Sequence, residues 1–324
     1  MPSKDLVVLT GGTGTVKLIN GLYRLIPEKV SIITNTGDDF IFYGLKVCPD
    51  TDSVLYSLGN LLNESNMWGL KDDTFEIGKI LKKLDIKENK VADWFNLGDK
   101  DLAYCLFRTH LMNNGKTFTE ATKLVQESIG INKNLEILPM SDNPVTTFFT
   151  TTDGKVYHFE EFFIRLKSEK PIEKIDYVNA EVAGTSDQII ERIHNAKIIL
   201  IGPSNPITSI GPILAIKEIK KAIKESNAKK VVISPIIGRE AYSGPAKTYM
   251  EAKGIEVSPI GIFDFYKDLA DEFYFATTDQ DLFEKELTAK AQEFNKKVIF
   301  DDIIFHSAEK QLSFAEKFVS TYGL

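Results

Sequence analysis

The sequence predicts an α/β fold of the Rossmann-like type, with a mainly parallel sheet flanked by helices. Short, mostly apolar runs occur at residues 6–9, 30–33, 198–201 and 231–233, and a loop follows each. Helical patterns lie between the runs, and such runs are typical of strands buried on both faces. Residues 53–180 instead combine helical patterns with short alternating strands. We therefore expect a single α/β domain over residues 1–324, with an inserted helical and antiparallel β portion at approximately 53–180.

The composition is that of an ordinary globular enzyme. The 324 residues are 43% hydrophobic and 26% charged, with a net charge of -7, which argues against binding to nucleic acid or to an anionic membrane. The first residues show no apolar pattern typical of a signal peptide, and no apolar run is long enough to span a membrane. The two cysteines, Cys48 and Cys105, predict neither a disulfide framework nor a metal cluster. We expect a cytoplasmic protein.

The first apolar run leads into a glycine-rich turn, and a helical pattern follows directly. The first N–H groups of such a helix, together with its dipole, form a binding site for phosphate. The glycine spacing matches neither the dinucleotide fingerprint nor the P-loop, so a turn that needs glycine only for its backbone shape is the alternative. The candidate phosphate-binding residues are Gly11, Gly12, Thr13, Gly14 and Thr15.

Clustered aspartates follow the second predicted strand, residues 30–34. They are Asp38, Asp39, Asp50 and Asp52. Ligands of open parallel sheets bind at the carboxyl ends of the strands, and hard carboxylate oxygens suit Mg²⁺. The alternative is turn chemistry, with Asp52 capping a helix that begins near residue 53. Because four aspartates lie beside the predicted phosphate site, we favour binding of a metal or a hydroxyl.

The inserted portion begins with helices, of which two are predicted over residues 101–114 and 119–129. Arg108 on the first either grips a phosphate or carboxylate, or forms an ion pair with Asp99 or Asp101. Short strands at 135–140, 145–150 and 155–159 follow, and they predict an antiparallel addition to the sheet or a small subdomain. His158 lies on the last of these, where we expect no catalytic role.

A second loop with polar and backbone-shaping residues follows the strand at 197–201. It spans residues 202–212, includes Ser204 and Asn205, and precedes a helix predicted at about 212–226. The loop follows its strand and precedes a helix, as the glycine turn does. This equivalent position favours binding of a phosphate or a nucleobase over the alternative, a rigid proline turn. Further strands are predicted at 231–233, from residue 255 onward, at 273–275 and at 298–300, and a closing helix at 307–322.

Ten segments spread over most of the chain carry a resemblance to a known family. They are Leu9–Gly14, Asn35–Phe40, Pro49–Tyr56, Trp68–Phe75, Trp94–Ala103, Arg108–Thr109, Leu138–Asp142, Pro203–Pro206, Ser209–Leu214 and Ser234–Gly238. Together, and in this order, they resemble the 2-phospho-L-lactate transferase family of coenzyme F420 biosynthesis. The chain departs from the family pattern at Lys100, where arginine is common, and at residues 263–266, which replace a more basic stretch.

The resemblance implies a reaction. The 2-phospho-L-lactate moiety, or phosphoenolpyruvate, would pass from a guanosine diphosphate ester, lactyl-2-diphospho-5'-guanosine, to the ribityl hydroxyl of 7,8-didemethyl-8-hydroxy-5-deazariboflavin (Fo), with release of GMP. It also implies Mg²⁺ dependence, and we expect a homodimer.

The resemblance also implies roles for individual residues. Those expected to bind Fo and the lactyl phosphate are Asp50, Asn89, Trp94, Arg108 and Thr109. Those expected to bind the donor are Gly11, Gly12, Thr13, Gly14, Thr15, Ser204 and Asn205. Candidate metal ligands are Asp38, Asp39, Asp50 and Asp52, and the candidate catalytic residues are Asp50, Asp52 and Asp39.

Two other functions compete with this one. A nucleotide-sugar-binding regulatory protein of the related cell-shape and gluconeogenesis factor family, without transferase activity, would share the glycine turn and the segment at 35–39. Such proteins should lack the segment at 94–99, so its presence favours the transferase. A nicotinamide-dependent dehydrogenase would need another glycine spacing and an acidic residue where Thr34 and Asn35 stand.

Overall fold

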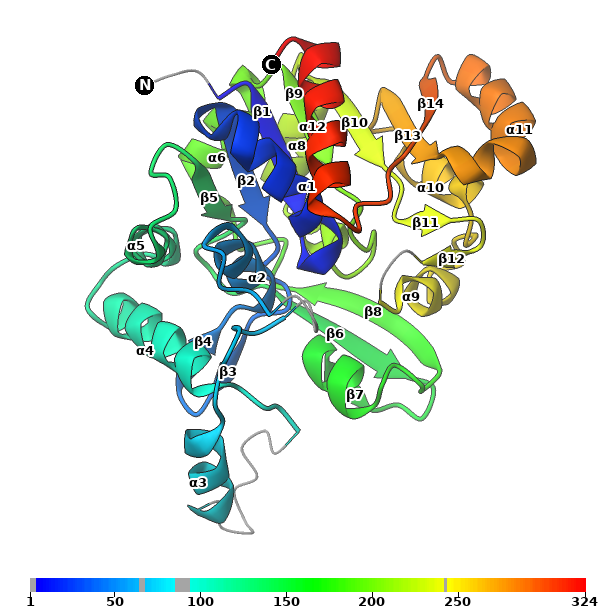
Figure 1. Ribbon diagram of the computed structural model, residues 1–324. Coiled ribbons are helices and arrows are strands. Elements are labelled where there is room, and N and C mark those ends of the chain that lie inside the picture. Colours follow the sequence, from blue (N-terminus) through cyan, green and yellow to red (C-terminus); the bar gives the residue numbers. More distant parts are fainter. Residues whose placement is uncertain (1–3, 64–67, 85–93, 242–243) are drawn as a thin grey trace.

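The computed structural model describes residues 4–63, 68–84, 94–241 and 244–324, apart from the side chain of Thr13. Seven strands form the central sheet in the order β14-β13-β10-β9-β1-β2-β5, and each neighbouring pair is parallel (Figure 1). This arrangement confirms the predicted α/β fold. The strands are β1 (Leu6–Thr10), β2 (Val30–Thr34), β5 (Glu136–Pro139), β9 (Ile198–Ile201), β10 (Lys229–Ile233), β13 (Glu272–Ala276) and β14 (Lys297–Asp301).

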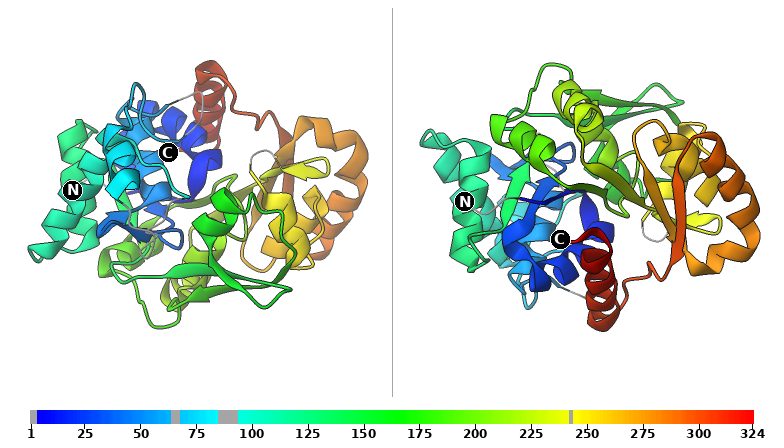
Figure 2. Two further views of the ribbon diagram at one scale, coloured as in Figure 1. Left: turned by 90° about the horizontal axis from the view of Figure 1, so that it is seen from below. Right: turned by 90° about the horizontal axis from the view of Figure 1, so that it is seen from above.

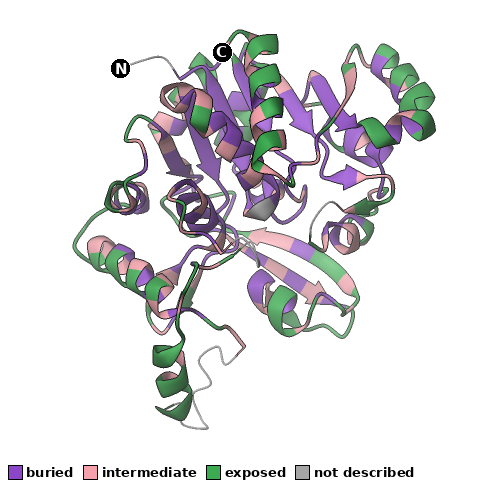
Figure 3. Cartoon of the chain, viewed as in Figure 1, coloured by how far each residue is buried: buried purple, intermediate pink, exposed green. Residues whose placement is uncertain are grey.

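The sheet is covered on both faces, because successive side chains of a strand point to opposite sides. Val7 and Leu9 of β1 belong to one core, whereas Leu6 and Val8 belong to the other. The second core includes α1 (Gly12–Leu25), α2 (Pro49–Leu58), α5 (Phe118–Ile129) and α12 (Ala308–Tyr322). The first includes α6 (Asp187–Asn195), α7 (Ile210–Ala215), α8 (Lys217–Glu225), α10 (Pro259–Tyr266) and α11 (Gln280–Glu293). Figure 2 shows the two helical layers, and Figure 3 shows the buried strands between them.

The order of the strands reverses between β1 and β9. β2 and β5 follow one another on one side of β1 in the sheet. β9, β10, β13 and β14 follow one another on the opposite side of β1. Ligands of doubly wound sheets bind at such a switch point, outside the carboxyl ends of the strands. The loops that follow β1 and β9 therefore lie at the position where this fold class binds ligands.

Two accessory units lie beyond the carboxyl ends of β1 and β2 (Figure 1). One contains the hairpin of β3 (Phe40–Phe42) and β4 (Leu45–Val47) with α3 (Glu76–Leu84) and α4 (Asp99–Asn113). The other is an antiparallel sheet of β6 (Thr146–Thr151), β7 (Val156–His158) and β8 (Ile172–Val178), with a π-helical turn over Glu161–Arg165. The remaining short elements are β11 (Ile236–Ile237), β12 (Glu240–Ala241), α9 (Ala246–Ala252) and two 3₁₀ helices at Pro27–Lys29 and Thr277–Asp279.

The structure corrects several expected elements. Residues 259–266, expected in a late strand, form the helix α10, which begins at a Ser258 cap followed by Pro259. The segment at 136–139 pairs parallel with β2 and belongs to the central sheet. α2 begins at Pro49 instead of near residue 53, so Asp50 and Asp52 lie in its first turn. The helix expected at 212–226 is divided at Ile216 into α7 and α8.

No helix in the described part of the chain combines the length and the apolar character that a membrane span needs.

Candidate functional site

A cavity of about 600 Å³ lies at the switch point of the sheet. Both loops, the first two turns of α2, the segment at 94–97 and the end of the antiparallel sheet contribute to its wall. The predicted site residues that line it are Gly11, Gly12, Gly14, Asp38, Asp50, Asp52, Trp94, Ser204 and Asn205. The fold thus brings both predicted loops and most of the predicted acidic residues to one place.

The glycine-rich turn is itself the first turn of α1. The helix begins at Gly12, whose φ of +63° lies in the left-handed region that glycine adopts without strain. Gly11 precedes it as an extended N-cap without a side-chain hydrogen bond. The first N–H groups of an α-helix lack acceptors within the helix, so this turn presents donors and a positive dipole end at the cavity.

The two loops pack against each other at the glycines. A Cβ atom on Gly14 would lie 2.2 Å from the Pro203 carbonyl oxygen, and one on Gly11 would lie 2.6 Å from the Cβ of Ser209. The Ser204 hydroxyl lies 2.6 Å from the Thr15 hydroxyl and also donates to the Gly11 carbonyl. Gly11 and Gly14 therefore make room for the second loop, and the two loops form one unit.

The Asn205 side chain shapes the second loop. Its Oδ1 accepts hydrogen bonds from the backbone N–H of Ile207 at 2.9 Å and of Thr208 at 3.3 Å. Thr208 and Ser209 line the cavity beside it. The polar side chains of this loop therefore hold its backbone in place at the cavity wall.

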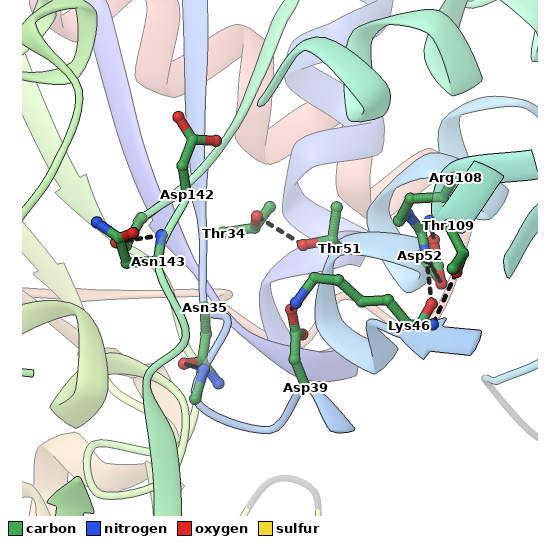
Figure 4. Close-up of polar contacts among 12 residues, drawn as sticks. Thr34, Asn35, Asp39, Lys46, Thr51, Asp52, Arg108, Thr109, Asp142 and Asn143 are labelled. Atoms are coloured by element: carbon green, nitrogen blue, oxygen red, sulfur yellow. Dashed lines mark hydrogen bonds and ion pairs between the residues drawn. The ribbon is translucent and has the colours of Figure 1, made fainter. Parts of the chain in front are cut away.

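Two of the four predicted aspartates form ion pairs. Asp39 Oδ2 lies 2.7 Å from Lys46 Nζ, and Asp52 accepts hydrogen bonds from both terminal nitrogens of Arg108 (Figure 4). Arg108 is fully buried. Although burial disfavours its charge, the adjacent Asp52 carboxylate raises the pKa of Arg108 well above its usual value. The partner of Arg108 is therefore Asp52, neither of the two residues considered from the sequence.

Some predicted site residues lie behind the cavity wall or outside the described residues. Thr109 accepts a hydrogen bond from the backbone N–H of Lys46 at 2.8 Å and donates to the Cys105 carbonyl at 2.7 Å, so it ties α4 to β4. The described residues Thr15, Asp39, Arg108 and Thr109 are not part of the cavity lining. Asn89 lies outside the described residues, as does the side chain of Thr13. The substrate contacts expected of these residues remain predictions.

Asp38 and Asp50 face the cavity, and no described Lys or Arg forms an ion pair with either. Asn35 Nδ2 donates to Asp50 Oδ2 at 2.8 Å and to the Thr208 carbonyl at 3.1 Å, which ties the segment after β2 and the start of α2 to the second loop. Burial raises the pKa of Asp50 to about 6, although the hydrogen bond from Asn35 opposes the shift. Burial and the nearby Asp50 raise the pKa of Asp38 well above its usual value. Asp38 Oδ1 is buried without a hydrogen-bond partner among the described residues.

A further carboxylate of the cavity wall is Glu160, which is absent from the site residues predicted above. It is 6% exposed, and burial followed by the charges of Asp50 and Asp39 raises its pKa to about 8. No motif marks this residue, because only the packing of the antiparallel sheet brings it to the cavity. The described lining contains no Lys, Arg or His at all.

Asp101 and Tyr56 form a further polar group on the wall. The Tyr56 hydroxyl donates to Asp101 Oδ1 at 2.7 Å, and burial followed by the charge of Asp52 raises the pKa of Asp101 to about 7. Potential ligand atoms of Asp52, Asp101 and Cys105 lie within 4.8 Å of one another. Because Arg108 already engages both oxygens of Asp52, this group has its own positive charge, and Asp38 and Asp50 are better candidates for a metal ion.

Aromatic side chains form the apolar part of the cavity. The ring of Trp94 lies 5.7 Å from that of Phe40 and 5.6 Å from that of Phe95. Trp68, 55% exposed, and Phe163 also line the cavity. A flat ring system can stack against such faces.

Comparisons with known proteins establish the fold and the family of the chain. The solved structure of a UPF0052 family member from Bacillus halodurans matches 98% of this chain and 99% of its own, with a TM-score of 0.63 and 19% identity, and shows the same fold. The 2-phospho-L-lactate transferase of Methanocaldococcus jannaschii is 36% identical over 322 residues, 98% of each chain. That of Methanopyrus kandleri is 40% identical over 264 residues, 81% of this chain and 82% of its own. The family model described as 2-phospho-L-lactate transferase CofD matches residues 6–316, and the chain belongs to that transferase family.

Proposed function

We propose that this protein transfers the 2-phospho-L-lactate moiety, or phosphoenolpyruvate, from lactyl-2-diphospho-5'-guanosine to the ribityl hydroxyl of Fo, with release of GMP, in coenzyme F420 biosynthesis. The observation that carries the proposal is the cavity at the switch point. It combines helix N–H donors, buried carboxylates and aromatic faces, and its described lining has no basic side chain. The helix N–H donors suit a diphosphate, the buried carboxylates suit an alcohol, and the aromatic faces suit a flat ring system.

The charge of the cavity supports a requirement for Mg²⁺. A diphosphate donor and several buried carboxylates repel one another unless a cation lies between them. Asp38 and Asp50 fit such an ion, because both line the cavity without an ionic partner among the described residues and Asp38 Oδ1 has no hydrogen-bond donor. When bound, Mg²⁺ would neutralise charge on the diphosphate during the transfer.

The remaining groups orient the two substrates. The donor phosphates bind to backbone N–H groups of the first turn of α1 and of residues 202–209, the part of the second loop that precedes α7. Trp94 stacks against the deazaflavin ring, which directs the ribityl chain towards Asp50. The ribityl oxygen forms a new bond to the phosphorus on the lactyl side, the bond from that phosphorus to the GMP oxygen breaks, and Asp50 takes the hydroxyl proton.

The test is a transfer assay with the full-length protein, Fo, the lactyl donor and Mg²⁺, in which mass spectrometry detects the Fo phosphodiester and GMP. The enolpyruvyl donor is assayed in parallel, and a reaction with EDTA measures the metal requirement. We expect Asp50→Asn to lose turnover. If no donor yields a product while a nucleotide sugar binds, the protein is instead a regulatory nucleotide-sugar-binding protein. Light scattering on the same sample tests the expected homodimer.

A further inference from the structure

His158 joins two segments that carry carboxylates of the cavity wall. The backbone N–H of Glu160 donates to Nδ1 of His158 at 3.1 Å, and Nε2 of the same ring lies 3.3 Å from the Asp39 carbonyl oxygen. Because Nδ1 accepts a hydrogen bond, the ring proton is on Nε2, which can donate to that carbonyl. One neutral imidazole thus contacts the backbone of both segments.

Hydrogen bonds from the antiparallel sheet hold the two residues that flank Asp38. On one side, the backbone N–H of Thr147 donates to the Gly37 carbonyl at 2.7 Å. On the other side, His158 holds the carbonyl of Asp39. Asp38 lies between these two anchors, and its buried Oδ1 has no described hydrogen-bond partner.

The carboxylates of Asp38 and Glu160 come from different sheets. Asp38 follows β2 of the central sheet, whereas Glu160 follows β7 of the antiparallel sheet. Their separation therefore depends on the contacts between the two units. We infer that His158 is a positioning residue that fixes Asp38 and Glu160 relative to each other. Asp38 and Asp50 then bind a divalent cation, and Glu160 contacts that ion through a bound water. The inference rests on the proposed metal-dependent transfer and adds two residues to it.

The ring of His158 also fills space, so its packing and hydrogen-bonding roles must be separated. Its centroid lies 5.6 Å from that of Phe40 and 5.9 Å from that of Phe148. His158→Phe retains an aromatic ring and removes both hydrogen bonds. His158→Asn retains an acceptor near the position of Nδ1, and His158→Gln retains a donor near that of Nε2, so each restores one of the two contacts.

The experiment measures Mn²⁺ binding to the full-length protein without substrates, by the electron paramagnetic resonance signal of free Mn²⁺, beside the unfolding temperature. We expect His158→Phe and Glu160→Gln to weaken Mn²⁺ binding by about 10- to 100-fold, the range found for groups that orient metal ligands. His158→Asn and His158→Gln should lose less. The controls are His194→Phe on the exposed surface of α6 and Glu161→Gln, whose native side chain pairs with Arg165.

The outcomes separate this inference from the proposed function. If Asp38→Asn abolishes Mn²⁺ binding while His158→Phe and Glu160→Gln bind as the unaltered protein does, the positioning role is refuted and the metal site stands. If Asp38→Asn also binds Mn²⁺ normally, the proposed metal site is wrong. A His158→Phe protein with a lower unfolding temperature but unchanged Mn²⁺ affinity would show a purely structural role. Should that variant not fold, the Asn and Gln variants give the same comparison.

Discussion

Replacing Gly14 by alanine should separate the two loops that form the predicted donor site. The new Cβ would lie 2.2 Å from the Pro203 carbonyl oxygen, whereas ordinary contact begins at 3.4 Å. The loops must therefore move apart by about 1.2 Å, and a misplacement of about 1 Å can reduce turnover by about 100-fold, equivalent to about 2.7 kcal/mol in activation free energy. Alanine stabilises a helix by about 1 kcal/mol relative to glycine. This gain offsets part of the stability lost through the contact of the new Cβ with Pro203.

The matched control for this substitution is Gly78→Ala. Gly78 also lies within a helix, α3, but the nearest atom outside that helix would be the Asn96 side-chain oxygen at 3.7 Å, so a Cβ fits there without displacement. The assay compares kcat/KM of the transfer reaction and the unfolding temperature of both variants. We expect a large loss of kcat/KM for Gly14→Ala and none for Gly78→Ala. A Gly14→Ala protein with unaltered donor KM and turnover would refute the assignment of the two loops to the donor.

Three further predictions concern the charged and aromatic groups. Arg108→Met should reduce the free energy of unfolding, measured in urea, by about 3–5 kcal/mol, because this change leaves the Asp52 carboxylate buried without its partner. Adding Asp52→Leu to the same chain should restore part of the lost free energy. Without divalent cations, the free energy of unfolding should fall as the pH rises from about 4 to 8. Asp50 and Glu160 have folded-state pKa values raised to about 6 and about 8, so each contributes stability that is lost on ionisation. The double variant Asp50→Asn, Glu160→Gln should show a weaker dependence of the free energy of unfolding on pH, measured by urea titrations at several pH values. An unchanged dependence would contradict this explanation. Trp94→Ala should raise the KM for Fo by about tenfold and leave kcat nearly unchanged, because a stacking contact contributes about 0.5–1.5 kcal/mol; an unchanged KM would exclude stacking on this ring.

The local pattern of the sequence was sufficient to predict the buried strands β1, β2, β9 and β10 and both loops. The apolar run of β1 and the glycines after it predict a strand and the start of a helix, and the structure confirms both. The loop at 202–212 was predicted to be equivalent in position, and it lies beside the first at the switch point. In each case the relevant residues are neighbours in the chain, so their spacing carries the information.

Features that depend on tertiary contacts were not predicted. The sequence does not show that Asp52 pairs with Arg108, because the partners are 56 residues apart and closer aspartates were available. It also does not show that Glu160 reaches the cavity, because its position depends on how the antiparallel sheet packs. Residues 259–266 are apolar on nearly every side, and a buried helix and a buried strand look alike in such a run.

The most direct test of the central claim is a crystal structure of the full-length protein with GDP and Mn²⁺, with the metal located by its anomalous scattering. We predict the diphosphate between the first turn of α1 and the loop at 202–209, with a Mn²⁺ peak beside Asp38 and Asp50. A diphosphate bound away from both loops, or a metal ion with no contact to either aspartate, would contradict this prediction.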